Sequence, residues 1–292
     1  MNYHPLTAIV MLAVFSFSCS ALANADVTSR EYKQLLDPAH FTYSSESLDV
    51  ASYDNVIKTN ISNAIGRNVN GSLSLNKNRQ IAFYDSPSSC VLRANGYLFR
   101  ERSYASSNEV TLKFRSSDRY ISAFEDLSSV TNGAETKLEA DIGLKNGDSY
   151  KVVYSHSTTA INTRTLSDFK DIHSHFPGFA DDYGFSDNLP LAVVGGIYIT
   201  EHVYKGTEID LGSIDAELSL TLWYVGQPSA AQHPMLAEVS FKIEDGSAAY
   251  SQKVVQRAKL ALEALQTLDN WNSIDNTSKT QRIYNAAGNF CQ

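Results

Sequence analysis

Three features that often assign a function directly are missing from this sequence: a basic excess, a membrane-spanning apolar run and a glycine-rich phosphate loop. The formal net charge is −8, which argues against a general nucleic-acid binder because such proteins need basic surface to neutralise phosphates. The apolar run Leu6–Phe17 is too short for a transmembrane helix. Neither a phosphate-cradling glycine loop nor a nucleophile elbow occurs. We therefore expect no duplex nucleic acid and no membrane among the partners.

The N-terminal residues predict a signal peptide. The run Leu6–Phe17 is followed by small residues that end near Ala23, which is the pattern of a cleavage site. Cys19 follows Phe17 and Ser18, which is not the spacing of a lipoprotein signal. We therefore predict that residues 1–23 are removed, and that residues 24–292 form a single exported domain, periplasmic or secreted, with a C-terminal helix.

Cysteine is scarce, and only Cys90 and Cys291 remain after the signal peptide. In an oxidising compartment these two residues could pair and tie the C-terminus to the middle of the chain. They could equally be two independent thiols, because the distance between them cannot be read from the sequence.

Segments with period-two alternation recur along the chain. About eight of them read as strands, one over Gln80–Tyr84, while helical spacing occurs near residues 53–65, 166–176 and 248–268. With 43% hydrophobic residues the chain can build one sizeable core. We predict an α+β fold, a closed antiparallel eight-stranded β-barrel with helices packed outside, whose interior holds side chains or one small ligand.

The segment Phe83–Arg115 carries the most informative pattern, an Asp-Ser-Pro turn followed by two strands. Successive residues of a strand lie on opposite faces of a sheet. A hairpin of these strands therefore gathers four cations on one face: Arg100, Arg102, Lys113 and Arg115. A local basic cluster in an acidic protein indicates a small, enclosed anionic ligand.

Two interpretations of this face remain open. On an open sheet it is simply solvated, as one face of an antiparallel sheet commonly is. Inside a barrel, each like-charge contact at ~4 Å would cost roughly 4 kcal/mol, so opposite charges or a bound polyanion must offset it. Other predicted strands supply carboxylates: Glu31, Glu139, Asp141 and Glu238. Cations and carboxylates in one lumen suit a phosphate ligand with Mg²⁺ or Mn²⁺.

The same residues resemble the core signature of the CYTH domain, in the triphosphate tunnel metalloenzyme superfamily. That signature has an aromatic-Asp-Thr/Ser-Pro turn, a Leu before a Gly, a strand with alternating arginines, and a strand reading Thr-Leu-Lys-x-Arg. The matching residues are Tyr84, Asp85, Ser86, Pro87, Leu92, Gly96, Arg100, Arg102, Thr111, Leu112, Lys113 and Arg115.

The resemblance implies a barrel whose charged tunnel binds a triphosphate with a divalent metal, Mg²⁺ or Mn²⁺. The implied activity is metal-dependent hydrolysis of a linear triphosphate, a polyphosphate or an organic triphosphate. It assigns phosphate binding to Lys33, Arg100, Arg102, Lys113 and Arg115, and metal binding to Glu31 and Glu238, with Glu139 and Asp141 as further candidate ligands. Glu31 and Lys113 are the candidate catalytic residues.

The sequence departs from the family pattern at three positions. Ser29 stands where the N-terminal motif has its first glutamate, and Ser240 and Lys242 stand where the last strand repeats glutamates. Fewer hard ligands hold a metal less tightly. The alternative interpretation is therefore a catalytically weakened CYTH-like protein that binds polyphosphate or another phosphorylated anion without turnover.

Overall fold

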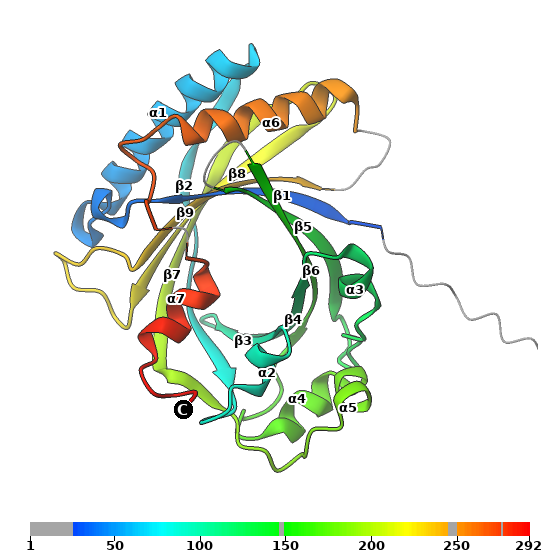
Figure 1. Ribbon diagram of the computed structural model, residues 1–292. Helices are drawn as coiled ribbons and strands as arrows, with labels where there is room; N and C mark the ends of the chain where they lie inside the picture. The colour runs from blue at the N-terminus through cyan, green and yellow to red at the C-terminus, as the bar shows by residue number, and fades with distance from the viewer. Residues whose placement is uncertain (1–25, 146–148, 245–249, 276) are drawn as a thin grey trace, which may run out of the picture.

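The computed structural model describes residues 26–145, 149–244, 250–275 and 277–292. The predicted signal peptide lies outside the described residues. A ring of strands dominates the structure and closes on itself in the order β1-β5-β6-β4-β3-β2-β7-β8-β9 (Figure 1). The strands are β1 (Ser29–Leu36), β2 (Val69–Asp85), β3 (Tyr97–Ser103), β4 (Asn108–Ser116), β5 (Glu135–Lys145), β6 (Ser149–Ile161), β7 (Ala192–Asp210), β8 (Asp215–Val225) and β9 (Leu236–Glu244).

The fold class is confirmed, but the barrel differs from the expected one in two details. It contains nine strands in the described part of the chain, and β1 pairs with β5 in parallel while the remaining pairs are antiparallel. A parallel pair needs a long crossover, and here the chain between β1 and β5 contains α1 and three strands. Strand alternation alone does not reveal direction.

Helices pack on the outside of the barrel, and α7 lies at one of its openings (Figure 1). No helix in the described ranges is both long and apolar enough to span a bilayer. The helices are α1 (Glu46–Ile65), α2 (Val91–Ala94), α3 (Arg119–Phe124), α4 (Phe169–His175), α5 (Pro177–Tyr183), α6 (Gln252–Gln266) and α7 (Lys279–Ala286), with 3₁₀ turns at Pro38–His40 and Tyr43–Ser45.

The apolar face of the strands points outward, toward the helices. One cluster includes Tyr32, Leu220 and Phe241 of the barrel and packs against α1 and α6. Another includes Phe99 and Leu112 and packs against α4 and α5. Because side chains alternate along a strand, this outward apolar face leaves the polar face for the interior.

The interior is not polar along its whole length. Ile81, Leu98 and Trp223 form a buried cluster with Ile283 and Tyr284 of α7. Leu98 lies opposite Lys113 in the β3–β4 register, so this apolar cluster adjoins the charged part of the lumen. The C-terminal helix therefore closes one end of the barrel with apolar side chains.

The Asp-Ser-Pro turn connects the barrel to this closing helix. The buried Asp85 accepts hydrogen bonds from the backbone N–H groups of Leu92 and Arg93 (3.0 and 3.1 Å) and from the hydroxyl of Tyr284 (2.7 Å). Cys90 and Cys291 form a disulfide, with their Cα atoms 5.2 Å apart. The signature aspartate thus has a structural role, as the acceptor that orients α2 and α7.

Candidate phosphate-binding site

The cationic hairpin faces the barrel interior. In the β3–β4 register Arg100 lies opposite Thr111, and Arg102 lies opposite Glu109. The alternate residues Phe99 and Leu112 belong to the outer apolar cluster, so the charged residues point the other way. The interpretation of an enclosed basic cluster therefore holds, and that of a solvated open face does not.

Arg100 and Arg102 carry charges that the described residues do not fully offset. The Nε atom of each is buried without a hydrogen-bond partner, and neither side chain forms an ion pair with a described residue. Burial, together with neighbouring arginines, lowers the pKa of both, and that of Arg100 well below its ordinary value. Because a guanidinium stays protonated in proteins, these shifts express the free-energy cost of two enclosed positive charges.

Lys113 lies between the cationic and the acidic parts of the lumen. Its Nζ is 3.8 Å from a carboxylate oxygen of Glu139. Burial, and next the charge of Arg115, lower the pKa of Lys113 to about 8, although Asp141 and Glu139 oppose this shift. The ammonium group is therefore only partly compensated at neutral pH.

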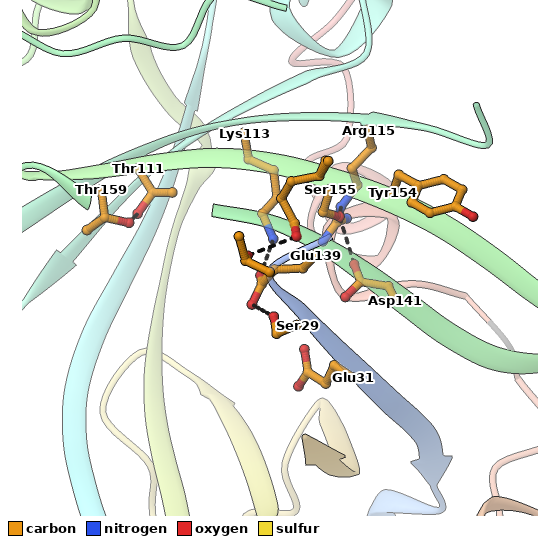
Figure 2. A network of polar contacts seen from close by, with 12 residues as sticks. Ser29, Glu31, Thr111, Lys113, Arg115, Glu139, Asp141, Tyr154, Ser155 and Thr159 are labelled. Atoms are coloured by element: carbon orange, nitrogen blue, oxygen red, sulfur yellow. Dashed lines mark hydrogen bonds and ion pairs between the residues drawn. The ribbon is translucent and has the colours of Figure 1, made fainter. Parts of the chain in front are cut away.

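Arg115 is better satisfied than the other cations of the hairpin. Its Nε donates to Ser155 Oγ (3.3 Å), which in turn donates to Asp141 Oδ2 (2.7 Å), and its Nη1 donates to Thr280 Oγ1 (3.4 Å). Figure 2 shows this chain of contacts across β4, β6 and β5. Arg115 thus joins the cationic side of the lumen to the acidic side.

Glu31 and Asp141 converge on one ammonium group. They are partners in the parallel β1–β5 register, and Lys33 Nζ lies 2.8 Å from Glu31 and 2.9 Å from Asp141. Burial alone would raise the pKa of Asp141, but Lys33, Lys113 and Arg115 lower it. Both carboxylates are therefore held in the charged form around Lys33.

The other two candidate metal ligands are each paired with a lysine. Glu139 accepts a hydrogen bond from Ser29 (3.1 Å), which Figure 2 shows. It also forms an ion pair with Lys242 (2.8 Å). Glu238 pairs with Lys279 at 2.8 Å. Lys242, which stands at a position where the family repeats glutamates, thus supplies an internal counter-ion.

The residues fit a divalent metal only in a limited way. No group of three or more His, Cys, Asp or Glu side chains among the described residues is arranged to hold a metal. Glu31 and Asp141 do share one cation position. Mg²⁺ is often bound by one or two carboxylates together with substrate phosphates, so this pair suits a metal that enters with its phosphate ligand.

Two further charged residues of the lumen were not anticipated. Arg79 on β2 forms a buried ion pair with Glu201 on β7, and Glu201 also accepts from Trp223 Nε1 (2.9 Å). The expected strand began at Gln80, whereas β2 begins at Val69 and includes Arg79, because the charged and polar first part of β2 conceals the strand. Glu201 is already ion-paired with Arg79. Its negative charge also partly offsets the charges of Arg100 and Arg102.

A cavity of about 370 Å³ opens beside this charged network. Its lining includes Lys33, Arg115 and Asp141 from the strands, together with Glu238 and, from the C-terminal segment, Lys279. The wall of this cavity therefore carries charged groups of both signs.

No protein-family model matches the chain, and no curated protein matches it. Three solved structures are similar to it over most of both chains. The putative adenylyl cyclase HpAC1 from Hippeastrum, described as having a dominant triphosphatase activity, is 13% identical, with 88% of this chain and 94% of that chain covered and a TM-score of 0.43.

The second is a putative adenylate cyclase from Bacillus halodurans, with 13% identity, coverage of 88% and 98%, and a TM-score of 0.38. The third is the PH1819 protein from Pyrococcus horikoshii, with 9% identity, coverage of 87% and 99%, and a TM-score of 0.34.

Proposed function

We propose that this barrel binds a linear triphosphate, a polyphosphate or an organic triphosphate, and hydrolyses a phosphoanhydride bond with the help of a divalent metal. The observation that carries the proposal is the half-buried pair Arg100 and Arg102, whose buried Nε donors lack partners. Guanidinium groups match phosphate oxygens in charge and geometry. A chain of phosphates would satisfy both donors and offset both charges.

Each side of the lumen has a distinct task in this proposal. Arg100, Arg102 and Lys113 hold and orient the phosphate chain, while Glu31 and Asp141 would hold Mg²⁺ or Mn²⁺ together with phosphate oxygens. The metal would supply charge neutralisation at the reacting phosphoryl group. Glu31 would also orient a water molecule, whose oxygen attacks phosphorus in line with the departing phosphate oxygen.

We further propose that the protein works in an exported compartment. The predicted signal peptide and the Cys90–Cys291 disulfide support this location, because disulfides persist in oxidising environments. Mass spectrometry of the mature protein tests both parts of the proposal, since it reports the first residue and the state of the thiols.

The test is phosphate release from tripolyphosphate by the purified protein, with and without Mn²⁺. We expect release that requires the metal and that Lys113→Ala abolishes. Lys259→Ala is the matched control, because Lys259 pairs with Glu263 on the outer helix α6 and should leave release unchanged. Absence of both release and a thermal shift with tripolyphosphate would contradict the proposal.

A second candidate function is binding without turnover. It is supported by Lys242 and Lys279, which pair with Glu139 and Glu238 and so reduce the carboxylates available to a metal. In that case tripolyphosphate raises the melting temperature, as a ligand of the native state does, but no phosphate is released.

A further inference from the structure

The C-terminal arm, residues 277–292, forms part of the cavity wall. Ile283 and Tyr284 of α7 pack into the apolar cluster that closes the barrel, and Figure 1 shows α7 at this opening. The start of the arm carries Ser278 and Lys279 into the lining of the 370 Å³ cavity. The arm therefore packs into the apolar cluster through α7 and lines the cavity through its first residues.

Lys279 is positioned to change partners. Its Nζ lies 2.8 Å from Glu238 and 5.5 Å from the ring centroid of Trp223. Its side chain remains about a quarter exposed, and it lines the same cavity as Lys33 and Arg115. A phosphate in this cavity would compete with Glu238 for the ammonium group, because both are oxyanions within its reach.

The rest of the arm is anchored to the end of β2 and to the turn between β2 and α2. The Cys90–Cys291 disulfide joins the two segments covalently. Ser88 N–H donates to Phe290 O (2.7 Å), and the Tyr284 hydroxyl donates to Asp85 (2.7 Å). These contacts hold α7 against the barrel and hence determine where Lys279 lies.

We propose that the disulfide-anchored arm is a phosphate-binding wall, in which Lys279 leaves Glu238 to bind a ligand phosphate. This inference rests on the proposed binding function and adds a ligand-binding residue to it. The disulfide pre-organises Lys279, and a constraint of this kind increases affinity by reducing the ordering needed on binding. Reduction of the disulfide therefore weakens phosphate binding.

The reduction is a two-electron exchange with a dithiol reductant. One reductant thiolate attacks a sulfur of the Cys90–Cys291 bond and releases the other cysteine as a thiolate. The second reductant thiol then displaces the first sulfur, so that the reductant becomes a cyclic disulfide and the protein carries two thiols after protonation.

Calorimetric titration with tripolyphosphate, in a chelator and without added metal, tests the role of Lys279. Lys279→Gln should weaken binding about tenfold, as expected for one charge-assisted contact, and Lys279→Arg should restore most of it. Glu238→Gln should strengthen binding, because it removes the competing carboxylate. Lys259→Gln on α6 is the control and should bind as the wild type does.

The anchor is tested with wild-type protein, oxidised and reduced by a dithiol, and with Cys291→Ser. Reduced wild type and Cys291→Ser should have the same affinity for tripolyphosphate, at least about threefold lower than that of oxidised wild type. The dithiol should not change the affinity of the variant. Circular dichroism at the same temperature verifies that the barrel remains folded.

Equal affinity of oxidised wild type, Lys279→Gln and folded Cys291→Ser would overturn this inference while leaving the proposed binding function intact. If oxidised wild type itself fails to bind tripolyphosphate, the proposed function fails, and the inference fails with it.

Discussion

The two sides of the lumen differ in how their charges are offset. On the β3 side, Arg100 and Arg102 have buried donors without partners. On the β1–β5–β9 side, lysines neutralise the carboxylates: Lys33 pairs with Glu31 and Asp141, Lys242 with Glu139, and Lys279 with Glu238. Each carboxylate of the acidic side therefore has a lysine partner without a ligand, whereas the arginines of the cationic side still need an anion.

This difference separates stability from binding within one lumen. A buried ion pair that loses one partner leaves an uncompensated charge, which is strongly destabilising. Glu201 offsets the charges of Arg100 and Arg102 only in part, so the folded state accepts a cost that a bound anion removes. Residues kept at such a cost are the ones expected to contact the ligand.

The largest expected effect comes from Arg100→Gln. We expect tripolyphosphate affinity to fall about a hundredfold, since a guanidinium makes two charge-assisted contacts worth about 1.5 kcal/mol or more each. The free energy of unfolding without ligand should rise by about 1 kcal/mol, because a half-buried and only partly offset charge is removed. Denaturant unfolding and calorimetry measure the two quantities on the same samples.

Arg164→Gln is the control for this substitution, because Arg164 is exposed and lies outside the barrel strands. A loss of both stability and affinity in Arg100→Gln would show that Arg100 is a structural residue, and the contrast between the two sides of the lumen would disappear.

Lys242→Gln should make the acidic side of the lumen a better metal-binding site. Glu139 would lose its 2.8 Å partner, and Mn²⁺ affinity without phosphate should rise roughly fivefold, the equivalent of about 1 kcal/mol. Titration of Mn²⁺ followed by electron paramagnetic resonance measures this change. Lys259→Gln, which removes the lysine partner of Glu263 on the outer surface, should leave Mn²⁺ binding as it is.

Lys113 should make affinity and stability respond to alkaline pH in opposite directions. Its pKa is about 8 in the folded protein and near 10.4 in an unfolded chain. Between these values the folded state binds fewer protons, so the free energy of unfolding rises with pH. Loss of the ammonium charge over the same range should weaken tripolyphosphate binding several-fold per pH unit.

Lys113→Arg removes both responses, because arginine stays charged. The ratio of the two affinity curves cancels the titration of tripolyphosphate itself. A ratio that is constant between pH 7.5 and 10 would mean that Lys113 does not contact the ligand.

The smallest effect is expected for Arg115→Gln. Its guanidinium already bonds to Ser155 and Thr280, so a ligand gains less from it, and affinity should fall only about threefold. Calorimetry alongside Arg100→Gln gives the comparison directly. Equal losses of affinity in the two variants would show that the hydrogen bonds Arg115 makes within the protein do not reduce its contribution to ligand binding.

Much of the site was predictable because strands alternate. The grouping of Arg100 and Arg102 on one face, and of Lys113 and Arg115 on the facing strand, follows from period two alone. Arg79 escaped prediction because the polar start of β2 has no apolar alternation to reveal it. The closing helix α7 escaped because Ile283 and Tyr284 are its two buried residues, too few for a periodic pattern.

The sequence by itself determined which side chains share a face, since this depends only on the geometry of an extended chain. The tertiary structure decided that the charged face is the inner one, because closure of the sheet exposes its other face to the apolar stripes of α1 and α6. It also decided which charges are offset. The partners Glu139 and Lys242, or Glu238 and Lys279, come from separate segments that only the folded barrel brings together.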